Sequence, residues 1–297
     1  MDDYVIEKFA DLFTGRQDAY GTDTGGAAWE PVTVEHYGRH LTGVEPFGIY
    51  PIRHVDGESL VRWGCCDIDT GDWSEAFMLA SALQGMGLYP HVERSRSKGW
   101  HIWVFVNSWI PARIMRRCLK VAYAAIDLPA KEANPKSESL RPEQLGNYVR
   151  LPYKAAAVVR SERQVVVTDW NVLNDGAPLD LHAFLFEMTQ PLFSPISQVE
   201  RWASKWYEPP RKHIDLQTDA DTASIAMSLP ATWQTVWRDG NVRDRSATFV
   251  AMAYDLAKRG WTPQQVFNVL WSCPWNKYRD RRQGEYYVQD IVERAFS

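Results

Sequence analysis

Two aspartates separated by one residue follow the apolar run SLVRWGCC. Asp67 and Asp69 flank Ile68, and because side chains alternate along a strand, both carboxylates point to the same face. Hard oxygen ligands of this kind suit Mg²⁺ or Mn²⁺, and a pair of such ions can clamp the attacking and leaving oxygens of a phosphoryl transfer. The alternative is an acidic exit from the strand, whose aspartates cap the next helix.

A basic loop, SRSKGWH at residues 95–101, directly precedes a second apolar run, HIWVFV. Serine hydroxyls and Lys98 can donate to phosphate oxygens, and glycine lets the backbone approach a ligand. His101, the first residue of the predicted strand, can reach the same ligand. The alternative is a solvated hairpin tip with a hydrogen-bonded histidine.

Two further charged residues follow the loop along the chain. Glu132, in EANPK, can act as a third metal carboxylate or as a base. Arg150, in GNYVRLP, can act as a cationic clamp on an anion. Taken alone, both residues would be surface charges on a loop and an edge strand.

The patterns around these motifs predict an α+β domain over residues 1–206. The expected order is a short amphipathic helix from residue 4, a Gly-rich loop, a hairpin FGIYPIRHV/SLVRWGCCDIDT turning at Asp56-Gly57, a helix over 73–86, the strand pair YPHVERS/HIWVFVNS, a helix over 111–126, the strands NYVRLPY and RQVVVTDW, and helical structure over 180–206. Strands paired by hairpins and interrupted by helices favour a mixed or antiparallel sheet.

The last third of the chain predicts a separate, all-α domain. Residues 207–224 are polar and contain Pro209-Pro210, which is typical of a linker, and residues 225–297 show helical periodicity, with Asp244 or Ser246 as helix cap. A basic and aromatic stretch near the C-terminus predicts contacts to DNA or, alternatively, a solvated helix end. Its candidate DNA-binding side chains are Trp275, Lys277, Arg279, Arg281 and Arg282.

Taken in order, the motifs resemble the signature of the archaeo-eukaryotic primase superfamily: DxD, a Ser/Gly-rich loop ending in a histidine before a strand, and a third acidic residue. FADLFTGRQDAY, GIYPIR, CDIDTGD, VERSRSKGWHIWVF, EANPKS and GNYVRLPY fall in the order found in phage and plasmid primase-polymerases and in the primase domain of TOTE conflict systems. The SRSKGWH loop is also similar to that of the polymerase domain in bacterial end-joining ligases. The segment NVRDRSATFVAMAYDLAKRGWTPQQVFNVLWSCP resembles the helical domain that follows the catalytic domain in phage primases.

The resemblance implies an RRM-like catalytic core and a set of residue roles. It assigns two Mg²⁺ or Mn²⁺ ions to three catalytic carboxylates, Asp67, Asp69 and Glu132. It assigns the triphosphate of a nucleotide to four side chains, Ser97, Lys98, His101 and Arg150. The sequence departs from the family pattern at Ser137, where relatives often have Gln, and at the third acidic site, where many have Asp and where Glu138 competes with Glu132.

Composition limits the remaining possibilities. The chain has 297 residues, a net charge of −4 and no apolar run long enough to cross a bilayer, and its N-terminus lacks the basic flank of a signal peptide. We therefore expect a cytoplasmic protein of a bacterial or phage-infected cell, without a membrane partner. The four cysteines have neither CxxC spacing nor nearby histidines, which argues against disulfides and structural zinc.

These observations predict a metal-dependent DNA primase-polymerase that transfers nucleotides to a 3'-hydroxyl and also synthesises primers. Its expected partners are a single-stranded DNA template and nucleoside triphosphates. Because the chain has no GxxxxGK[ST] loop, a replicative helicase would be a partner or another part of a larger protein. Two alternatives remain: a non-catalytic module that binds single-stranded DNA or a replication origin, and a metal-dependent nuclease.

Overall fold

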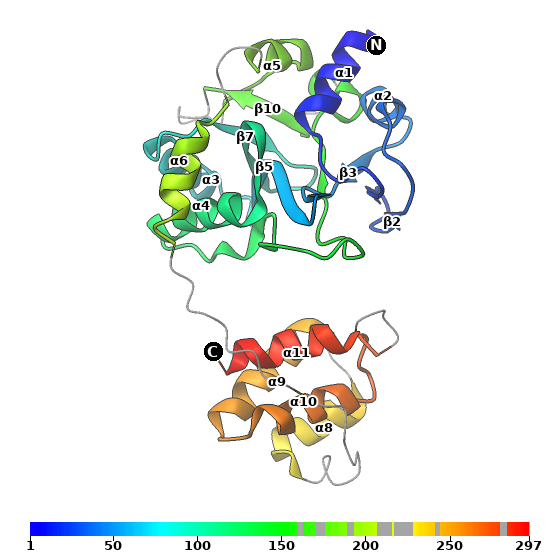
Figure 1. Cartoon of the computed structure of the whole chain (residues 1–297), viewed down its shortest axis with the longest axis vertical. Helices are drawn as coiled ribbons and strands as arrows, with labels where there is room; N and C mark the ends of the chain where they lie inside the picture. Colours follow the sequence, from blue (N-terminus) through cyan, green and yellow to red (C-terminus); the bar gives the residue numbers. More distant parts are fainter. Residues whose placement is uncertain are drawn as a thin grey trace. The chain divides into compact units, whose positions relative to one another are not determined.

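The chain forms two compact units, Met1–Tyr207 and Glu208–Ser297 (Figure 1). The structure is a computed structural model, and it describes residues 1–159, 163–169, 176–188, 193–206, 216, 228–240, 244–279 and 284–296. The predicted linker, 207–224, lies outside the described residues apart from Leu216, which packs in the core of the second unit.

The larger sheet of the first unit is antiparallel at every described pair of strands. Its strands run in the spatial order β11 (Ala177–Pro178), β10 (Val165–Thr168), β6 (Pro90–Arg94), β7 (Trp100–Pro111), β5 (Glu58–Ile68) and β4 (Arg53–Val55), and β8 (Ala133–Asn134) also pairs with β5. In this register His101 of β7 lies opposite Asp67 of β5 on one side and opposite Glu93 of β6 on the other. Three polar side chains are thereby brought side by side at one end of the sheet.

A smaller antiparallel sheet packs against one face of the larger one. Its order is β2 (Ala27–Ala28), β1 (Tyr20–Thr22), β3 (Phe47–Ile49) and β9 (Val149–Arg150). Phe47 and Val149 of this sheet share a buried cluster with Trp63 and Trp103 of the larger sheet. The contact between the two sheets therefore forms one of the cores of the unit.

Helices cover both faces of the larger sheet (Figure 1). One face, with Cys66 and Ile102, packs against α3 (Trp73–Gly85), α4 (Ala112–Ala125) and α6 (Ile196–Ala203). The other face packs against the smaller sheet and against α1 (Asp3–Leu12), α2 (Val34–Thr42) and α5 (Leu181–Glu187). Because side chains alternate, Asp67 shares this second face with the buried residues Trp63 and Cys65.

The predicted α+β class with antiparallel strand pairing is confirmed. One predicted strand, FGIYPIRHV, is instead two strands. The hairpin at Asp56-Gly57 forms between β4 and β5, but FGIYPIRHV gives two strands in two different sheets. Pro51 lies between β3 and β4, and proline has no N–H to donate to a ladder, so the run breaks there.

A helix also forms where the sequence predicts a loop. The N–H of Thr33 donates to His36 Nδ1 (3.1 Å) at the start of α2, and Gly43 ends the helix in the left-handed region (φ 80°). Within α2, His40 is buried; its Nε2–H donates to the carbonyl of Pro152 (2.7 Å) and its Nδ1 accepts from the N–H of Phe47 (3.4 Å). Burial lowers the pKa of His40 to about 4, against a smaller opposing effect of the Pro152 hydrogen bond.

The second unit is helical, as predicted. Its described helices are α8 (Ala231–Asp239), α9 (Arg245–Lys258), α10 (Pro263–Ser272) and α11 (Gly284–Ala295). The Asp244 carboxylate caps α9 by accepting from the N–H groups of Ser246 (2.8 Å) and Ala247 (3.1 Å). In the described part of the chain, no helix is both long and apolar enough to cross a bilayer.

Candidate active site

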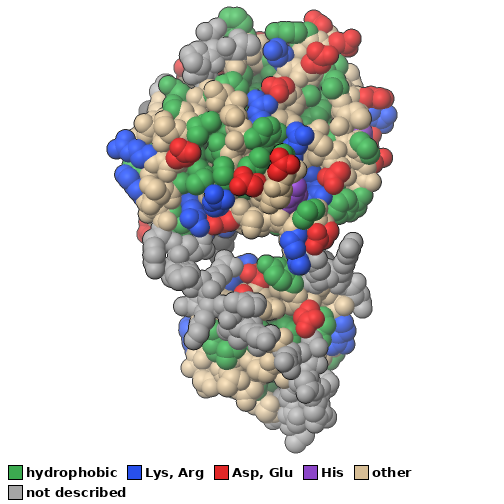
Figure 2. Space-filling model, in the orientation of Figure 1, with side chains coloured by type: hydrophobic (Ala, Val, Ile, Leu, Met, Phe, Trp, Pro, Cys, Tyr) green, Lys and Arg blue, Asp and Glu red, His purple; other side chains and the backbone are tan. Residues whose placement is uncertain are grey.

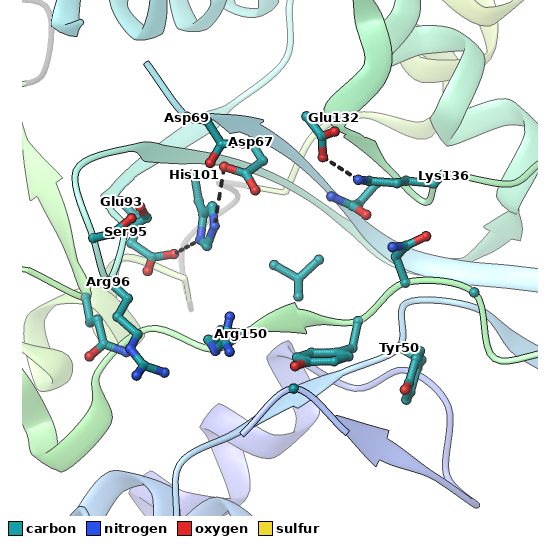
Figure 3. A pocket seen from close by; sticks show the side chains of 18 of the residues that line it. Tyr50, Asp67, Asp69, Glu93, Ser95, Arg96, His101, Glu132, Lys136 and Arg150 are labelled. Carbon is teal, nitrogen blue, oxygen red and sulfur yellow. Dashed lines mark hydrogen bonds and ion pairs between the residues drawn. The ribbon is translucent and has the colours of Figure 1, made fainter. Parts of the chain in front are cut away.

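A cavity of about 510 Å³ opens at the polar end of the contact between the two sheets. Its lining combines Asp67, Glu93 and His101 of the larger sheet with Tyr148 and Arg150, at and beside β9 of the smaller one. Figure 3 shows the acidic side chains and His101 on one side of the cavity, and Arg150 and Tyr50 on the other. A volume of this size accommodates a small molecule such as a nucleotide.

All three predicted carboxylates line the cavity: Asp67, Asp69 and Glu132. Burial raises the pKa of Asp67; the charge of His101 opposes this shift, whereas the charges of Asp69 and Glu132 add to it. The carboxylates therefore repel one another, and a bound cation would relieve that repulsion. Of the acidic cap proposed as the alternative, Asp72 alone fits: its carboxylate accepts from the N–H of Ser74 (2.8 Å) at the start of α3.

The fit to a divalent cation rests on Asp67 and Asp69, whose oxygen ligands match Mg²⁺ or Mn²⁺. Glu132, at the end of the 3₁₀ turn Ala130–Glu132, is ion-paired with Lys136. Within the described ranges, no three His, Cys, Asp or Glu side chains are arranged so that they could hold one ion. Two carboxylates suffice for Mg²⁺, which retains several of its waters.

Glu132 and Glu138, the two candidates for the third carboxylate, lie in different surroundings. Glu138 is absent from the cavity lining, and its carboxylate binds the Arg117 guanidinium of α4 through two hydrogen bonds (2.9 and 2.8 Å). Glu132 lines the cavity. Of the two, Glu132 is therefore the one positioned to act there.

His101 is buried between two carboxylates. Its Nδ1 lies 2.9 Å from Glu93 Oε2, and its Nε2 lies 3.8 Å from Asp67 Oδ1. Burial acts to lower the pKa of His101, but the charge and hydrogen bond of Glu93, together with the charge of Asp67, raise it to about 8. His101 is thus a cationic group on the acidic wall, as is Lys136 beside Glu132, and the His101 Nε2 is on the side of the Asp67 carboxylate.

Basic groups reach the cavity from the other side. Arg150 and Arg96 both line it, and both bind Asp23 of the Gly-rich loop: Arg96 Nη1 lies 2.6 Å from Asp23 Oδ1, and Arg150 Nη2 donates to the Asp23 carbonyl (3.2 Å). Arg150 Nε makes no hydrogen bond within the described residues, nor does Asn134 Oδ1, another lining atom. Figure 2 shows acidic, basic and histidine side chains close together on one face of the first unit.

Tyr148 can pack flat on the smaller sheet at the wall of the cavity because two residues of that sheet, Gly21 and Gly48, are glycines. The ring of Tyr148 lies on Gly21 and Gly48, where an added Cβ would come within 2.2 and 2.4 Å of ring carbons. The Tyr148 hydroxyl donates to the carbonyl of Thr22 (3.2 Å), and its ring lies 5.8 Å from the Arg150 guanidinium carbon. Any side chain at Gly21 or Gly48 would displace this wall of the cavity.

The basic loop is arranged differently from the expectation in two respects. Ser97 lines the cavity, but Lys98 does not; Lys98 is exposed and lies beside Gly71. A Cβ on Gly99 would lie 2.3 Å from the Ile68 carbonyl oxygen, so this glycine allows close packing on β5 rather than an approach to a ligand. The basic side chain of this loop that lines the cavity is instead Arg96, which the sequence analysis did not single out.

The predicted DNA-binding stretch is partly described. Trp275 is packed against the core of the second unit, and its indole N–H donates to the carbonyls of Val236 and Trp237 (both 3.0 Å). Arg279 is exposed, with Nη2 donating to the Trp271 carbonyl (2.9 Å), and Lys277 lies 5.3 Å from the Tyr278 ring. The last two candidates, Arg281 and Arg282, lie outside the described residues.

Sequence reasoning missed Glu93, Arg96 and Asn134 of the lining, and it missed Asp23, which binds the two lining arginines. The signal for Glu93 was its position, as a carboxylate in the predicted strand YPHVERS directly before the basic loop. Asp23 had none, because its contact with Arg96 joins residues 73 positions apart.

The sequence was found to be similar to one protein family. A family model described as "TOTE conflict system, Archaeo-Eukaryotic Primase domain" matches residues 21–179, more than half of the chain. Among solved structures, the polymerase domain from Mycobacterium tuberculosis Ligase D in complex with DNA is 13% identical, with a TM-score of 0.35, and the match covers 68% of this chain and 91% of that chain. No curated protein matches the sequence.

Proposed function

The chain belongs to the archaeo-eukaryotic primase family of TOTE conflict systems, and from this premise we propose that it is a metal-dependent, template-directed nucleotidyltransferase that both extends and synthesises primers. In this reaction the 3'-hydroxyl of a strand attacks the α-phosphate of a nucleoside triphosphate, and pyrophosphate leaves. The substrates would be nucleoside triphosphates and a single-stranded DNA template.

One observation carries the proposal: a single cavity of about 510 Å³ has carboxylates and His101 on one wall and two arginines on the other. A triphosphate with bound cations needs both kinds of group, anionic oxygens for the cations and cationic donors for the phosphates. Two buried polar atoms of the lining, Arg150 Nε and Asn134 Oδ1, make no hydrogen bond to any residue that the structure describes, which supports a polar ligand.

Each residue then has a distinct task. Asp67 and Asp69 would hold Mg²⁺ or Mn²⁺, with Glu132 as the third carboxylate once released from Lys136. The bound ions would neutralise charge on the reacting phosphate oxygens. The nucleotide would be held by Ser97, Arg96 and Arg150, and by His101 from the acidic wall, whereas Lys98, the fourth predicted side chain, lies outside the cavity lining.

The second unit would hold the template during initiation. Starting a strand requires two free nucleotides to be ordered on a single strand, without the help of a stacked primer end. Basic and aromatic side chains supply sequence-tolerant contacts of this kind, and Lys277 and Arg279 are the described candidates. A replicative helicase would supply the unwound template.

The test is a denaturing gel with a labelled primer annealed to a longer template, with Mn²⁺ and nucleoside triphosphates. The proposal predicts a ladder of longer products, and de novo products on a template without a primer. Retarded DNA on a native gel without extension would instead indicate the binding module, and a shortened label would indicate a nuclease. Either of these two results would overturn the proposed activity.

A further inference from the structure

Glu93 is a buried carboxylate to which the proposed chemistry assigns no task. It lies on β6 and is 1% exposed. Its Oε2 accepts hydrogen bonds from two ring nitrogens, His101 Nδ1 (2.9 Å) and Trp103 Nε1 (2.7 Å). Taking a carboxylate out of water is costly unless its lone pairs are satisfied, so both contacts matter to the position of this group.

The strand register explains why three residues meet. Glu93 lies directly opposite His101 in the β6–β7 pair, and Trp103 follows His101 by two positions, so all three side chains lie on the same face. His101 and Trp103 meet edge to face, with ring centroids 5.8 Å apart at 89°. The imidazole of His101 is therefore held by Glu93 at Nδ1 and by an edge-to-face contact with the Trp103 indole.

Trp103 cannot easily move, and this makes Glu93 a fixed acceptor. Trp103 is fully buried and packs edge to face against Phe13 (5.1 Å) and Trp63 (5.2 Å). Its only indole N–H is committed to Glu93. Core packing thereby fixes the indole, the indole orients the carboxylate, and the carboxylate orients the imidazole.

From this arrangement we infer that Glu93, braced by Trp103, is a positioning residue that holds His101 Nδ1 so that Nε2 is presented to the triphosphate of a bound nucleotide. The inference rests on the proposed function. It also accounts for an otherwise unfavourable feature, a carboxylate on β6, a strand whose five residues are all buried. In Figure 3, dashed lines join His101 to Glu93 on one side and to Asp67 on the other.

The test is a double-mutant cycle on nucleotide affinity. Calorimetry with ATP and with dATP, each with Mn²⁺, is applied to wild type, Glu93→Leu, His101→Ala and the double variant. Leucine keeps the approximate volume of glutamate but accepts no hydrogen bond. We expect Glu93→Leu to weaken binding roughly tenfold when His101 is present and less than about twofold when it is absent, because a positioning residue acts only through its target.

Two matched pairs of variants separate positioning from general stability. Glu93→Gln retains an acceptor and should bind within about threefold of wild type. Trp103→Phe removes the N–H that braces Glu93 and should weaken binding, whereas Trp63→Phe removes an indole N–H from the same core that donates to Thr14 instead (2.8 Å) and should not. If Glu93→Leu does not fold, Trp103→Phe with and without His101→Ala gives the same cycle.

The outcomes divide cleanly. Equal losses from Glu93→Leu with and without His101, or equal affinities of Trp103→Phe and Trp63→Phe, would overturn the positioning role while leaving the proposed function intact. A wild-type protein that binds neither nucleotide would overturn both together. Loss of affinity that depends on His101 and is restored by glutamine supports the inference.

Discussion

Asp23 occupies the arginines that the proposed activity requires for a triphosphate, and its removal gives a prediction of opposite sign to most mutations. Asp23 Oδ1 lies 2.6 Å from Arg96 Nη1 and 4.0 Å from Arg150 Nε. A carboxylate placed between two guanidinium groups resembles a phosphate in charge and geometry. Asp23→Asn should therefore increase, not decrease, the affinity for nucleoside triphosphates.

The magnitude follows from exposure. The Arg96 and Asp23 side chains are 49% and 34% exposed, so solvent screens their attraction and the pair is worth at most about 1 kcal/mol. Releasing the arginines should tighten triphosphate binding by about two- to fivefold, which corresponds to about 0.4–1 kcal/mol. The gain should shrink as salt is raised, because exposed charges are screened over about 8–10 Å at ordinary ionic strength.

The assay is calorimetric titration of ATP and dATP at low and high salt. Asp56→Asn is the matched control: it removes the same charge at an exposed turn, and asparagine tolerates the left-handed backbone of that position (φ 51°). Weaker binding by Asp23→Asn would refute the competition. An equal gain in affinity for Asp56→Asn would mean that the effect comes from the net charge of the protein and not from release of the arginines.

Three further predictions concern stability, the third carboxylate and priming. The contribution of His40 to the free energy of unfolding should fall by about 3 kcal/mol as pH drops from 6.5 to about 4, because His40 in the unfolded chain takes up a proton near pH 6.5 whereas the buried ring does so only near pH 4. Denaturant titrations should show this pH-dependent difference between wild type and His40→Gln, but not between wild type and His182→Gln, a change at an exposed histidine. Glu132→Gln should slow primer extension more than tenfold, whereas Glu138→Gln should leave it within about twofold, since Glu138 binds Arg117 outside the cavity; equal rates in a gel assay would contradict the assignment. A chain ending near residue 210 should extend primers but lose most de novo synthesis, and equal priming by both lengths would make the second unit dispensable.

Local patterns were sufficient for most of the first unit. Alternation along the strand predicted that the Asp67 and Asp69 side chains converge, and both line the cavity; the Asp56-Gly57 turn identified the β4–β5 hairpin. Both signals act over a few residues, which is the range that side-chain alternation and turn chemistry cover. Family resemblance, rather than periodicity, connected these pieces to Glu132 and Arg150.

Contacts between distant segments were beyond the reach of such patterns. The smaller sheet pairs β3 with β9, whose residues Gly48 and Arg150 are far apart in the chain, and this pairing brings Arg150 to the cavity. The choice of Arg96 over Lys98 depends on how a tight loop folds back on Ile68, which the residue types alone do not determine. Residue chemistry was predictable; the direction of each side chain required the fold.

The central claim is that the acidic wall of the cavity carries out nucleotidyl transfer, and one experiment addresses it directly. Primer extension with Mn²⁺ is compared between wild type and the double variant Asp67→Asn/Asp69→Asn. The account predicts that extension falls more than about 100-fold while the melting temperature stays equal or rises, because burial and like charges already disfavour the ionised form of Asp67. A folded double variant that extends primers at the wild-type rate would contradict it.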